Sequence, residues 1–218
     1  MKLPNFKNSF YYENNFYLSC EKSRIGKFMA HYELFKMSAN VPGSIVECGV
    51  FKGISLIRFA SFRDMIGIKS KKIIGFDVFG KFPETKFIQD QIMRKKFIKD
   101  SGTNGISKHQ LELVLKHKRL DQNIDLVKGN VVKTIPEYVK KHPKLKISFL
   151  NLDTDVYEPA VTILEYLYPK IVKGGILALD DYGVFPGETK AINEYFKGKN
   201  VKIKKFPFSK TPSYIIKN

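Results

Sequence analysis

The chain has 218 residues, of which 43% are hydrophobic and 13% aromatic, a composition that excludes a disordered polymer and fits one packed domain. Its formal net charge is +17, from 38 Lys and Arg against 21 Asp and Glu. Because the basic residues are mostly Lys and are spread from Lys2 to Lys217, we favour a solvated basic surface, while an anionic small substrate and a polyanion stay open as alternatives.

The sequence contains neither a disulfide framework nor a zinc motif. Cys20 and Cys48 are its two cysteines, no CxxC is present, and no His pair stands at ligand spacing. No apolar run reaches the roughly 18 residues of a membrane span, and the N-terminus lacks the apolar core of a signal peptide. We therefore expect a cytoplasmic protein without a membrane span.

Residues 1–40 are predicted to form an arm followed by a helix. The first 18 residues or so are polar and aromatic without a clear period, so we expect them to pack on the domain or on a neighbouring subunit. The period from Glu21 to Ala39 is helical, and its apolar stripe consists of Ile25, Phe28, Met29, Tyr32 and Phe35. The whole chain, residues 1–218, is predicted to be a single domain.

A strand, a glycine turn and a helix are predicted next. The strand Ser44–Cys48 runs into the pattern E-x-G-x-x-x-G, which spans Glu47 to Gly53, and a helix follows from Ile54. The dinucleotide motif has Gly where Glu47 stands, and a carboxylate repels a pyrophosphate but tolerates a cationic ligand with an amino group. The turn therefore favours S-adenosylmethionine, which carries a sulfonium, an ammonium and no phosphate. A purely structural turn is the alternative.

The second strand, Lys72–Phe76, ends at Asp77, at the spacing of an acid that binds ribose hydroxyls. Residues 78–120 then interrupt the alternation of strands and helices, and we expect a lid-like insertion above the sheet. Within it, Ser107 and Gln110 form a capping box that predicts a helix from Lys108 to about Lys118. A third strand, Ile124–Lys128, follows.

Two apolar runs that each end in a pair of acids form the centre of the chain. Ile147–Leu152 precedes Asp153 and Asp155, and Gly175–Leu179 precedes Asp180 and Asp181. Between the runs, apolar residues at helical spacing predict a helix: Ala160, Ile163, Leu164 and Leu167. A right-handed crossover makes the two strands parallel and brings all four acids to the carboxyl edge of one sheet, where ligands bind in open α/β folds.

Four acids at one edge imply either a bound cation or raised pKa values. Asp153, Asp180 and Asp181 offer the hard oxygen donors that Mg²⁺ or Ca²⁺ prefers. The alternative is that Asp180 and Asp181 only cap a turn before Gly183. Asp155, if it is not a ligand, is the best candidate for a general base.

The C-terminal region completes the predicted fold. A helix from Glu188 to Phe196 precedes two strands, Val201–Phe206 and Ser213–Ile216, that are close enough to pair antiparallel. We therefore expect an α/β protein whose Rossmann-like sheet is mostly parallel with an antiparallel last strand and has helices on both faces.

Four segments together resemble the macrocin O-methyltransferase family, which comprises sugar O-methyltransferases that use S-adenosylmethionine and a divalent metal. The segments are IVECGVFKG, GFDVFGKFPET, LDTDVYEPAVTILEYLYPKIVKGGILALDDYG and PGETKAINEYF. The resemblance implies a class I methyltransferase fold and a homo-oligomer, dimer or higher. It also implies Mg²⁺-assisted methylation of a sugar hydroxyl on a nucleotide sugar, a glycosylated metabolite or a polysaccharide unit. The chain departs from the family at Thr189, where members usually have Arg.

Carried over by motif, the resemblance implies Mg²⁺ ligands at Asp153, Asp180 and Asp181 and a base at Asp155. The residues predicted to bind S-adenosylmethionine are Glu47, Gly49, Gly53, Ser55, Asp77, Gly129 and Asn130.

Other functions are less favoured. A catechol-like small-molecule O-methyltransferase and a nucleic-acid methyltransferase are alternative enzymes, but LDTDVYEP stands where amino-methylating enzymes on DNA or RNA typically have Asn/Asp-Pro-Pro-Tyr. A non-enzymatic RNA-binding module is least favoured, because four clustered acids repel phosphate. We therefore expect no specific nucleic-acid partner. The four histidines, His31, His109, His117 and His142, are predicted to be surface or core residues rather than catalysts.

Overall fold

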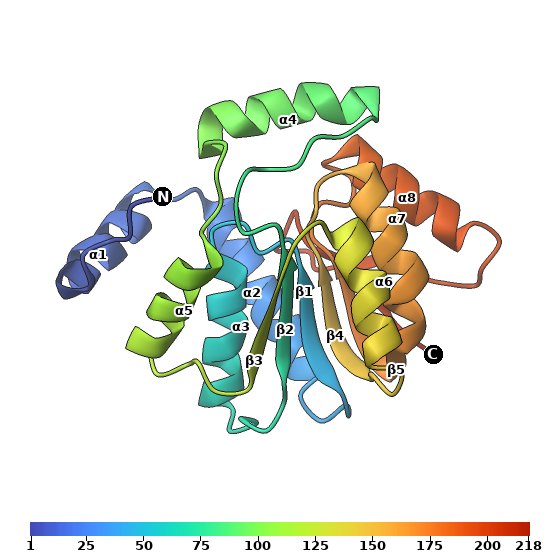
Figure 1. The fold of residues 1–218 in the computed structure, drawn as a ribbon, viewed down its shortest axis with the longest axis horizontal. Coiled ribbons are helices and arrows are strands. Elements are labelled where there is room, and N and C mark those ends of the chain that lie inside the picture. The colour runs from blue at the N-terminus through green and yellow to red at the C-terminus, as the bar shows by residue number, and fades with distance from the viewer.

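A seven-stranded sheet with helices on both faces forms the body of the computed structural model, which describes all 218 residues (Figure 1). The strands are β1 (Ser44–Cys48), β2 (Ile73–Asp77), β3 (Ile124–Lys128), β4 (Ile147–Leu152), β5 (Ile171–Leu179), β6 (Lys204–Lys205) and β7 (Ser213–Ile216). They lie in the order β3-β2-β1-β4-β5-β7-β6. Strands β1 to β5 are parallel, and β7 runs antiparallel to both neighbours. The predicted mostly parallel sheet with its antiparallel finish is confirmed.

Eight α-helices surround the sheet. They are α1 (Ser9–Ser19), α2 (Lys22–Met37), α3 (Ile54–Met65), α4 (Ile88–Ser101), α5 (Lys108–His117), α6 (Val131–Lys141), α7 (Tyr157–Tyr166) and α8 (Pro186–Phe196). Short 3-10 turns lie at Phe6–Asn8 and Tyr168–Lys170. The predicted capping box at Ser107 and Gln110 is formed and begins α5.

Two hydrophobic clusters lie on opposite faces of the sheet because successive strand residues point to opposite sides. On β1, Ile45 packs with α2, α3 and α5, whereas its neighbour Val46 packs with α6, α7 and α8. Both residues are fully buried. Burial on both faces explains why the parallel strands are continuous apolar runs in the sequence.

The segment 78–120, predicted to be one lid-like insertion, divides into two parts. Residues 78–105 rise from the carboxyl edge of the sheet and carry α4, which lies above that edge (Figure 1). In contrast, α5 returns to the body, where its buried Leu111, Val114 and Leu115 join the cluster with α3. The capping box therefore begins an ordinary crossover helix between β2 and β3.

The N-terminal arm contains a helix that the sequence pattern did not predict. Helix α1 has no buried residue and stands off from the body (Figure 1), so it does not pack on its own domain. Only the residues before it reach the body, where the ring of Phe6 stacks on that of His117. Packing on a neighbouring subunit stays a prediction.

The apolar stripe predicted for α2 is wrong in part. Phe28 and Met29 are 45% and 47% exposed, while the buried face consists of Gly26, Ala30, His31, Leu34 and Phe35. Gly26 belongs to this face because α2 passes close to other backbone there: a Cβ on Gly26 would lie 2.6 Å from the carbonyl oxygen of Phe208.

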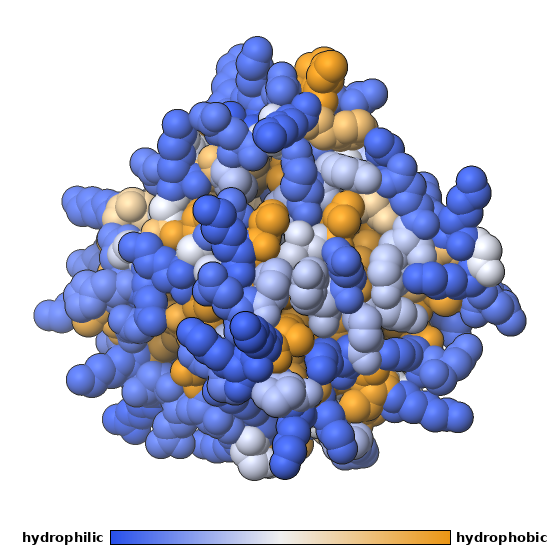
Figure 2. All heavy atoms as spheres, turned by 45° about the vertical axis from the view of Figure 1, so that its right-hand side comes forward, coloured by the Kyte–Doolittle hydropathy of each residue, from blue (hydrophilic) through white to orange (hydrophobic).

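One face of the molecule is predominantly hydrophilic. Figure 2 shows one side of the molecule, on which polar side chains surround small and scattered apolar patches. None of the helices combines the length and the apolar character that crossing a bilayer requires.

Candidate active site

Backbone hydrogen bonds fix the residues that directly follow β1, β4 and β5 at the carboxyl edge of the sheet. The backbone N–H of Gly49 donates to Phe76, that of Asp153 to Cys48, and that of Asp180 to Leu152, at 2.9 to 3.0 Å. The ladder of hydrogen bonds therefore continues one residue past the strands. It brings the glycine turn and both acidic loops to one edge, as the crossover predicted.

A pocket opens at this edge. Three of the predicted cofactor residues line it, namely Gly49, Asp77 and Asn130. The other predicted cofactor residues, Glu47, Gly53, Ser55 and Gly129, lie outside its lining. The acidic loop contributes Asp153, Thr154 and Asp155, and the remaining lining residues are Phe51, Val78, Gly80, Phe82, Pro83, Val131 and Pro159.

Asp77 holds the glycine turn in place. Its carboxylate accepts hydrogen bonds from the backbone N–H groups of Val50, Phe51 and Phe79, at 2.9, 3.0 and 2.5 Å. Phe51 and Phe79 both have positive φ angles, which side-chain-bearing residues rarely adopt. Asp77 therefore stabilises strained positions in two loops, the glycine turn after β1 and the turn after β2.

Glu47 is a fully buried acid below the glycine turn. Its Oε1 accepts a hydrogen bond from Asn151 at 3.3 Å, whereas its Oε2 has no partner. Burial raises the pKa of Glu47 to about 8, although hydrogen bonds from Ser55 and Asn151 act to lower it. At neutral pH this group is predominantly protonated and lacks one hydrogen-bond partner.

Glu47→Gln is expected to stabilise the protein increasingly as the pH rises. Below about pH 4.5 the acid is protonated in both the folded and the unfolded chain. Rising pH ionises the unfolded chain first, so the parent loses stability up to the folded pKa of about 8 and no further above it. The stability difference between variant and parent should grow by up to about 5 kcal/mol over that window, measured by urea unfolding.

The exposed Glu137 supplies the matched control. Glu137→Gln should leave the pH dependence above pH 5 like that of the parent. A stability difference between Glu47→Gln and the parent that stays constant from pH 5 to pH 8 would show that Glu47 does not titrate as described.

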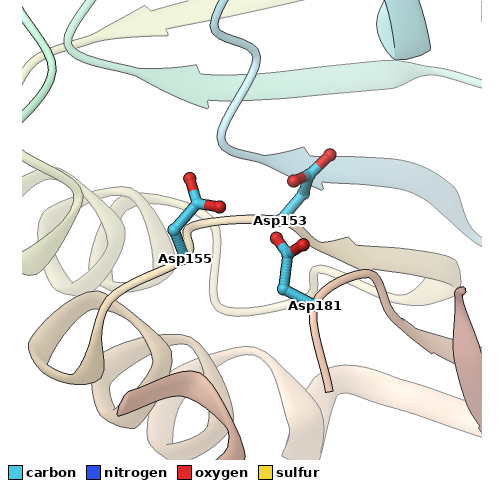
Figure 3. Close-up of side chains that lie close together, drawn as sticks. All are labelled: Asp153, Asp155 and Asp181. Carbon is cyan, nitrogen blue, oxygen red and sulfur yellow. The ribbon is translucent and has the colours of Figure 1, made fainter. Parts of the chain in front are cut away.

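Three carboxylates from the two acidic loops converge. Asp153 and Asp155 follow β4, Asp181 follows β5, and one oxygen of each lies within 4.8 Å of the others (Figure 3). Asp155 has a φ of 63°, an uncommon conformation for a residue other than glycine. Burial and the neighbouring Asp153 carboxylate raise its pKa.

Asp180 is not one of these three converging carboxylates, and its own partners lie on α2. Its Oδ2 forms an ion pair with Lys27 of α2, and its Oδ1 lies 3.0 Å from His31 Nε2. Burial acts to raise the pKa of Asp180, but the Lys27 ammonium and His31 hold it below its ordinary value. The guanidinium of Arg58 lies 2.9 Å from His31 Nδ1 and can only donate, so His31 accepts there and donates Nε2–H to Asp180.

Glu188 is a further buried acid at this edge, in the first turn of α8. Its Oε1 accepts from the backbone N–H of Asp181 at 3.1 Å, and its Oε2 has no hydrogen-bond partner. Asp181 Oδ2 is also buried without a partner. Unsatisfied buried oxygens on hard donors fit a divalent cation, because an uncompensated buried acid is otherwise costly.

Thr189 stabilises the loop after β5. Its hydroxyl accepts from Gly183 N–H at 2.8 Å and donates to the Phe185 carbonyl at 2.7 Å.

Sequence reasoning missed Lys27, His31 and Glu188 as parts of this centre. Lys27 and His31 stand four residues apart on one face of α2, but that signal has meaning only once α2 is known to cross the end of β5. For Glu188 the sequence pattern indicates only the start of a helix.

Comparison with known proteins agrees with this architecture. A family model described as macrocin-O-methyltransferase (TylF) matches residues 20–209. The 8-demethyl-8-(2,3-dimethoxy-alpha-L-rhamnosyl)-tetracenomycin-C 4'-O-methyltransferase of Streptomyces olivaceus is 27% identical over 152 residues, which is 68% of this chain and 56% of that protein. The chain spans less than two thirds of the length of the curated relatives that it matches.

Two solved structures of one methyltransferase are also similar to this chain. The crystal structure of CalS11, a calicheamicin methyltransferase, has a TM-score of 0.80 at 28% identity and covers 94% of this chain and 83% of that chain. The apo structure of CalS11, described as a TDP-rhamnose 3'-O-methyltransferase, has a TM-score of 0.69 at 25% identity and covers 95% and 86%. Because the family model matches most of its length, the chain belongs to the macrocin-O-methyltransferase family.

Proposed function

We propose that the protein transfers a methyl group from S-adenosylmethionine to a hydroxyl of a sugar-containing small molecule, with the help of a divalent cation. The observation that carries the proposal is the adjacency of two features. The pocket of the glycine turn shares Asp153 and Asp155 with the acidic group that includes Asp181. A methyl donor and an acceptor hydroxyl bound at these two features would lie next to each other.

The pocket suits S-adenosylmethionine in its charge as well as its location. Gly49, Asp77 and Asn130 line the pocket, and the unpartnered Oε2 of Glu47 lies buried below the turn. Asp77, Asp153 and Asp155 line the pocket and no Lys or Arg does, so its acidic lining disfavours a phosphate-bearing cofactor and favours a cationic one.

Asp153 and Asp181 are the proposed cation ligands, with Mg²⁺ as the preferred ion. Both are oxygen donors, and Asp181 Oδ2 has no competing partner. A bound divalent cation would supply Lewis acidity that lowers the pKa of an acceptor hydroxyl. Asp180 can join these ligands only if Lys27 gives up its ion pair.

Asp155 is the proposed general base. Its carboxylate lies beside Asp153 and Asp181, and burial raises its pKa above the ordinary value for Asp. A base with a raised pKa accepts a proton more readily. Asp155 would take the hydroxyl proton at a carboxylate oxygen as the hydroxyl oxygen bonds to the sulfonium methyl and the methyl–sulfur bond breaks, with S-adenosylhomocysteine as the leaving group.

The part of the insertion that carries α4 is the proposed cover of the reaction. Phe97 of α4 packs on Phe51 and Phe82, both of which line the pocket, with ring centroids 5.3 and 5.2 Å apart. Its ring also lies 6.3 Å from that of Phe185 before α8. These aromatic rings would exclude water from the methyl donor.

A sugar acceptor is proposed from the relatives. The name of the Streptomyces olivaceus enzyme describes a rhamnosyl-tetracenomycin substrate, and the description of CalS11 names TDP-rhamnose. The phosphate groups of a nucleotide sugar would also be attracted by the net charge of +17. A glycosylated metabolite and a polysaccharide unit are the other acceptors to be tested.

The test is a methyl-transfer screen that measures release of S-adenosylhomocysteine. Nucleotide sugars, glycosylated metabolites and polysaccharide fragments are supplied with Mg²⁺, and each active pair is repeated in EDTA. We expect turnover with at least one sugar acceptor and its loss in EDTA. Turnover on a catechol or on RNA alone would replace the proposal with one of those activities, and full activity in EDTA would remove the cation from it.

A further inference from the structure

Asp90 is the only buried residue of α4, an otherwise exposed helix. Its side chain is 0% exposed, whereas Ile88 and Ile92 on the same helix are 71% and 68% exposed. This is the reverse of the usual distribution, in which Ile is buried and Asp is in water. A buried carboxylate requires specific partners.

The partners of Asp90 belong to two other helices. Its Oδ2 accepts the backbone N–H of Tyr157, the first residue of α7, at 2.9 Å. Its Oδ1 accepts the backbone N–H of Gly187, the second residue of α8, at 2.8 Å. The first N–H groups of a helix have no partner within it and lie at its positive end. One carboxylate from α4 therefore caps both α7 and α8.

Gly187 gives Asp90 the space that it occupies. A Cβ at this position would lie 1.8 Å from Asp90 Oδ2. Gly187 is not among the glycines with positive φ, so its backbone conformation is open to other residues. The requirement for glycine here comes from the close approach of the Asp90 carboxylate.

A reciprocal contact joins α7 to the chain that enters α4. Glu158, in the first turn of α7, accepts from the backbone N–H of Lys86 and from the hydroxyl of Thr85, both at 2.9 Å. The start of α4 is therefore fastened to the start of α7 from both sides.

The two capped helices follow the two acidic loops. Helix α7 begins two residues after Asp155, and α8 begins five residues after Asp181. We propose that Asp90 is a positioning residue: through the first turns of α7 and α8 it holds the two acidic loops in their mutual arrangement and links that arrangement to the position of α4. The consequence for methyl transfer rests on the function proposed above, whereas the mechanical link does not.

Hydrogen exchange tests the mechanical link directly. In Asp90→Asn, peptides that cover residues 153–160 and 180–188 should exchange about tenfold faster than in the parent, while peptides from β2 and α3 keep their rates. Asp100→Asn, an exposed change at the other end of α4, is the matched control and should resemble the parent. Unchanged exchange in the two loops, or an equal increase throughout the chain, would overturn the proposal.

Gly187→Ala should disrupt the same contact from the side of α8. The added methyl group should displace the Asp90 carboxylate and accelerate exchange in the same two loops. In an Asp90→Ala background the methyl group has room, so adding Gly187→Ala should then change exchange little. Additive effects of the two substitutions would mean that Gly187 and Asp90 act independently and would contradict the proposed contact.

Binding measurements connect the link to the active site. Asp90→Asn should weaken Mn²⁺ binding at least fivefold while the affinity for S-adenosylhomocysteine stays within twofold of the parent. A parent that binds neither probe would refute the proposed function and leave the exchange result to decide the role of Asp90. A parent that binds Mn²⁺ with the same affinity as Asp90→Asn would overturn the positioning of the acidic loops.

Discussion

Asp181→Asn is expected to lower the rate of methyl transfer by about 10³-fold or more, because the substitution removes a charged donor from the proposed cation site and metal Lewis acidity contributes several kcal/mol. Asp181 is suited to this role since its Oδ2 is buried without a hydrogen-bond partner and lies with Asp153 and Asp155. The measurement is turnover with the acceptor found by screening, together with Mn²⁺ affinity. Binding of S-adenosylhomocysteine should change by less than about threefold, because Asp181 does not line the cofactor pocket.

Asp121→Asn is the control for this experiment, since Asp121 is exposed and distant in sequence from both acidic loops. It should retain the turnover and the Mn²⁺ affinity of the parent. If Asp181→Asn bound Mn²⁺ as tightly as the parent does, Asp181 would not be a ligand.

The same two measurements on Asp155→Asn and Asp180→Asn separate a base from a ligand. A base at Asp155 predicts that Asp155→Asn loses turnover but keeps its Mn²⁺ affinity. A third ligand at Asp180 predicts a loss of both in Asp180→Asn. The alternative is that Asp155 is a ligand and Asp180 is not, in which case Asp155→Asn would lose Mn²⁺ affinity and Asp180→Asn would keep it. This alternative is supported by the convergence of Asp155 with Asp153 and Asp181 and by the pairing of Asp180 with Lys27.

Gly49→Ala is expected to destabilise the protein by about 3–5 kcal/mol and to abolish cofactor binding. Gly49 has a φ of +92°, and a Cβ there would lie 1.6 Å from the carbonyl oxygen of Asp153. That oxygen belongs to backbone, so no side-chain rotation relieves the contact. The methyl group must therefore push the glycine turn and the acidic loop apart. Urea unfolding and calorimetric binding of S-adenosylhomocysteine measure the two effects.

Gly67→Ala separates the strain of a positive φ from the steric contact. Gly67 has a φ of +75° and nothing within 4 Å of an added Cβ. Its replacement should cost about 1–2 kcal/mol, the usual cost of a left-handed conformation, and leave cofactor binding intact. Equal losses of stability in the two variants, with cofactor binding retained in both, would show that the contact between Gly49 and Asp153 is unimportant.

Periodicity and strand-end chemistry by themselves determined the sheet, most of its helices and the location of the site. Apolar runs such as Ile147–Leu152 indicate buried parallel strands, and crossover handedness then brings the carboxyl ends of β1 to β5 to one edge. The first rule is local, and the second holds for nearly every parallel crossover. The sequence also predicted the capping box of Ser107 and Gln110, because its two hydrogen bonds join residues that are only three positions apart.

The tertiary structure alone decided which acid meets which partner. Asp180 and Asp181 are adjacent in sequence, yet Asp180 pairs with Lys27 and His31 of α2, whereas Asp181 lies with Asp153 and Asp155. Neighbouring residues at a strand end point to opposite sides, so their partners come from different parts of the chain. Asp90 belongs to the same class, since its partners Tyr157 and Gly187 are 67 and 97 residues away. No local pattern specifies such contacts, because they depend on how helices from distant parts of the chain pack together.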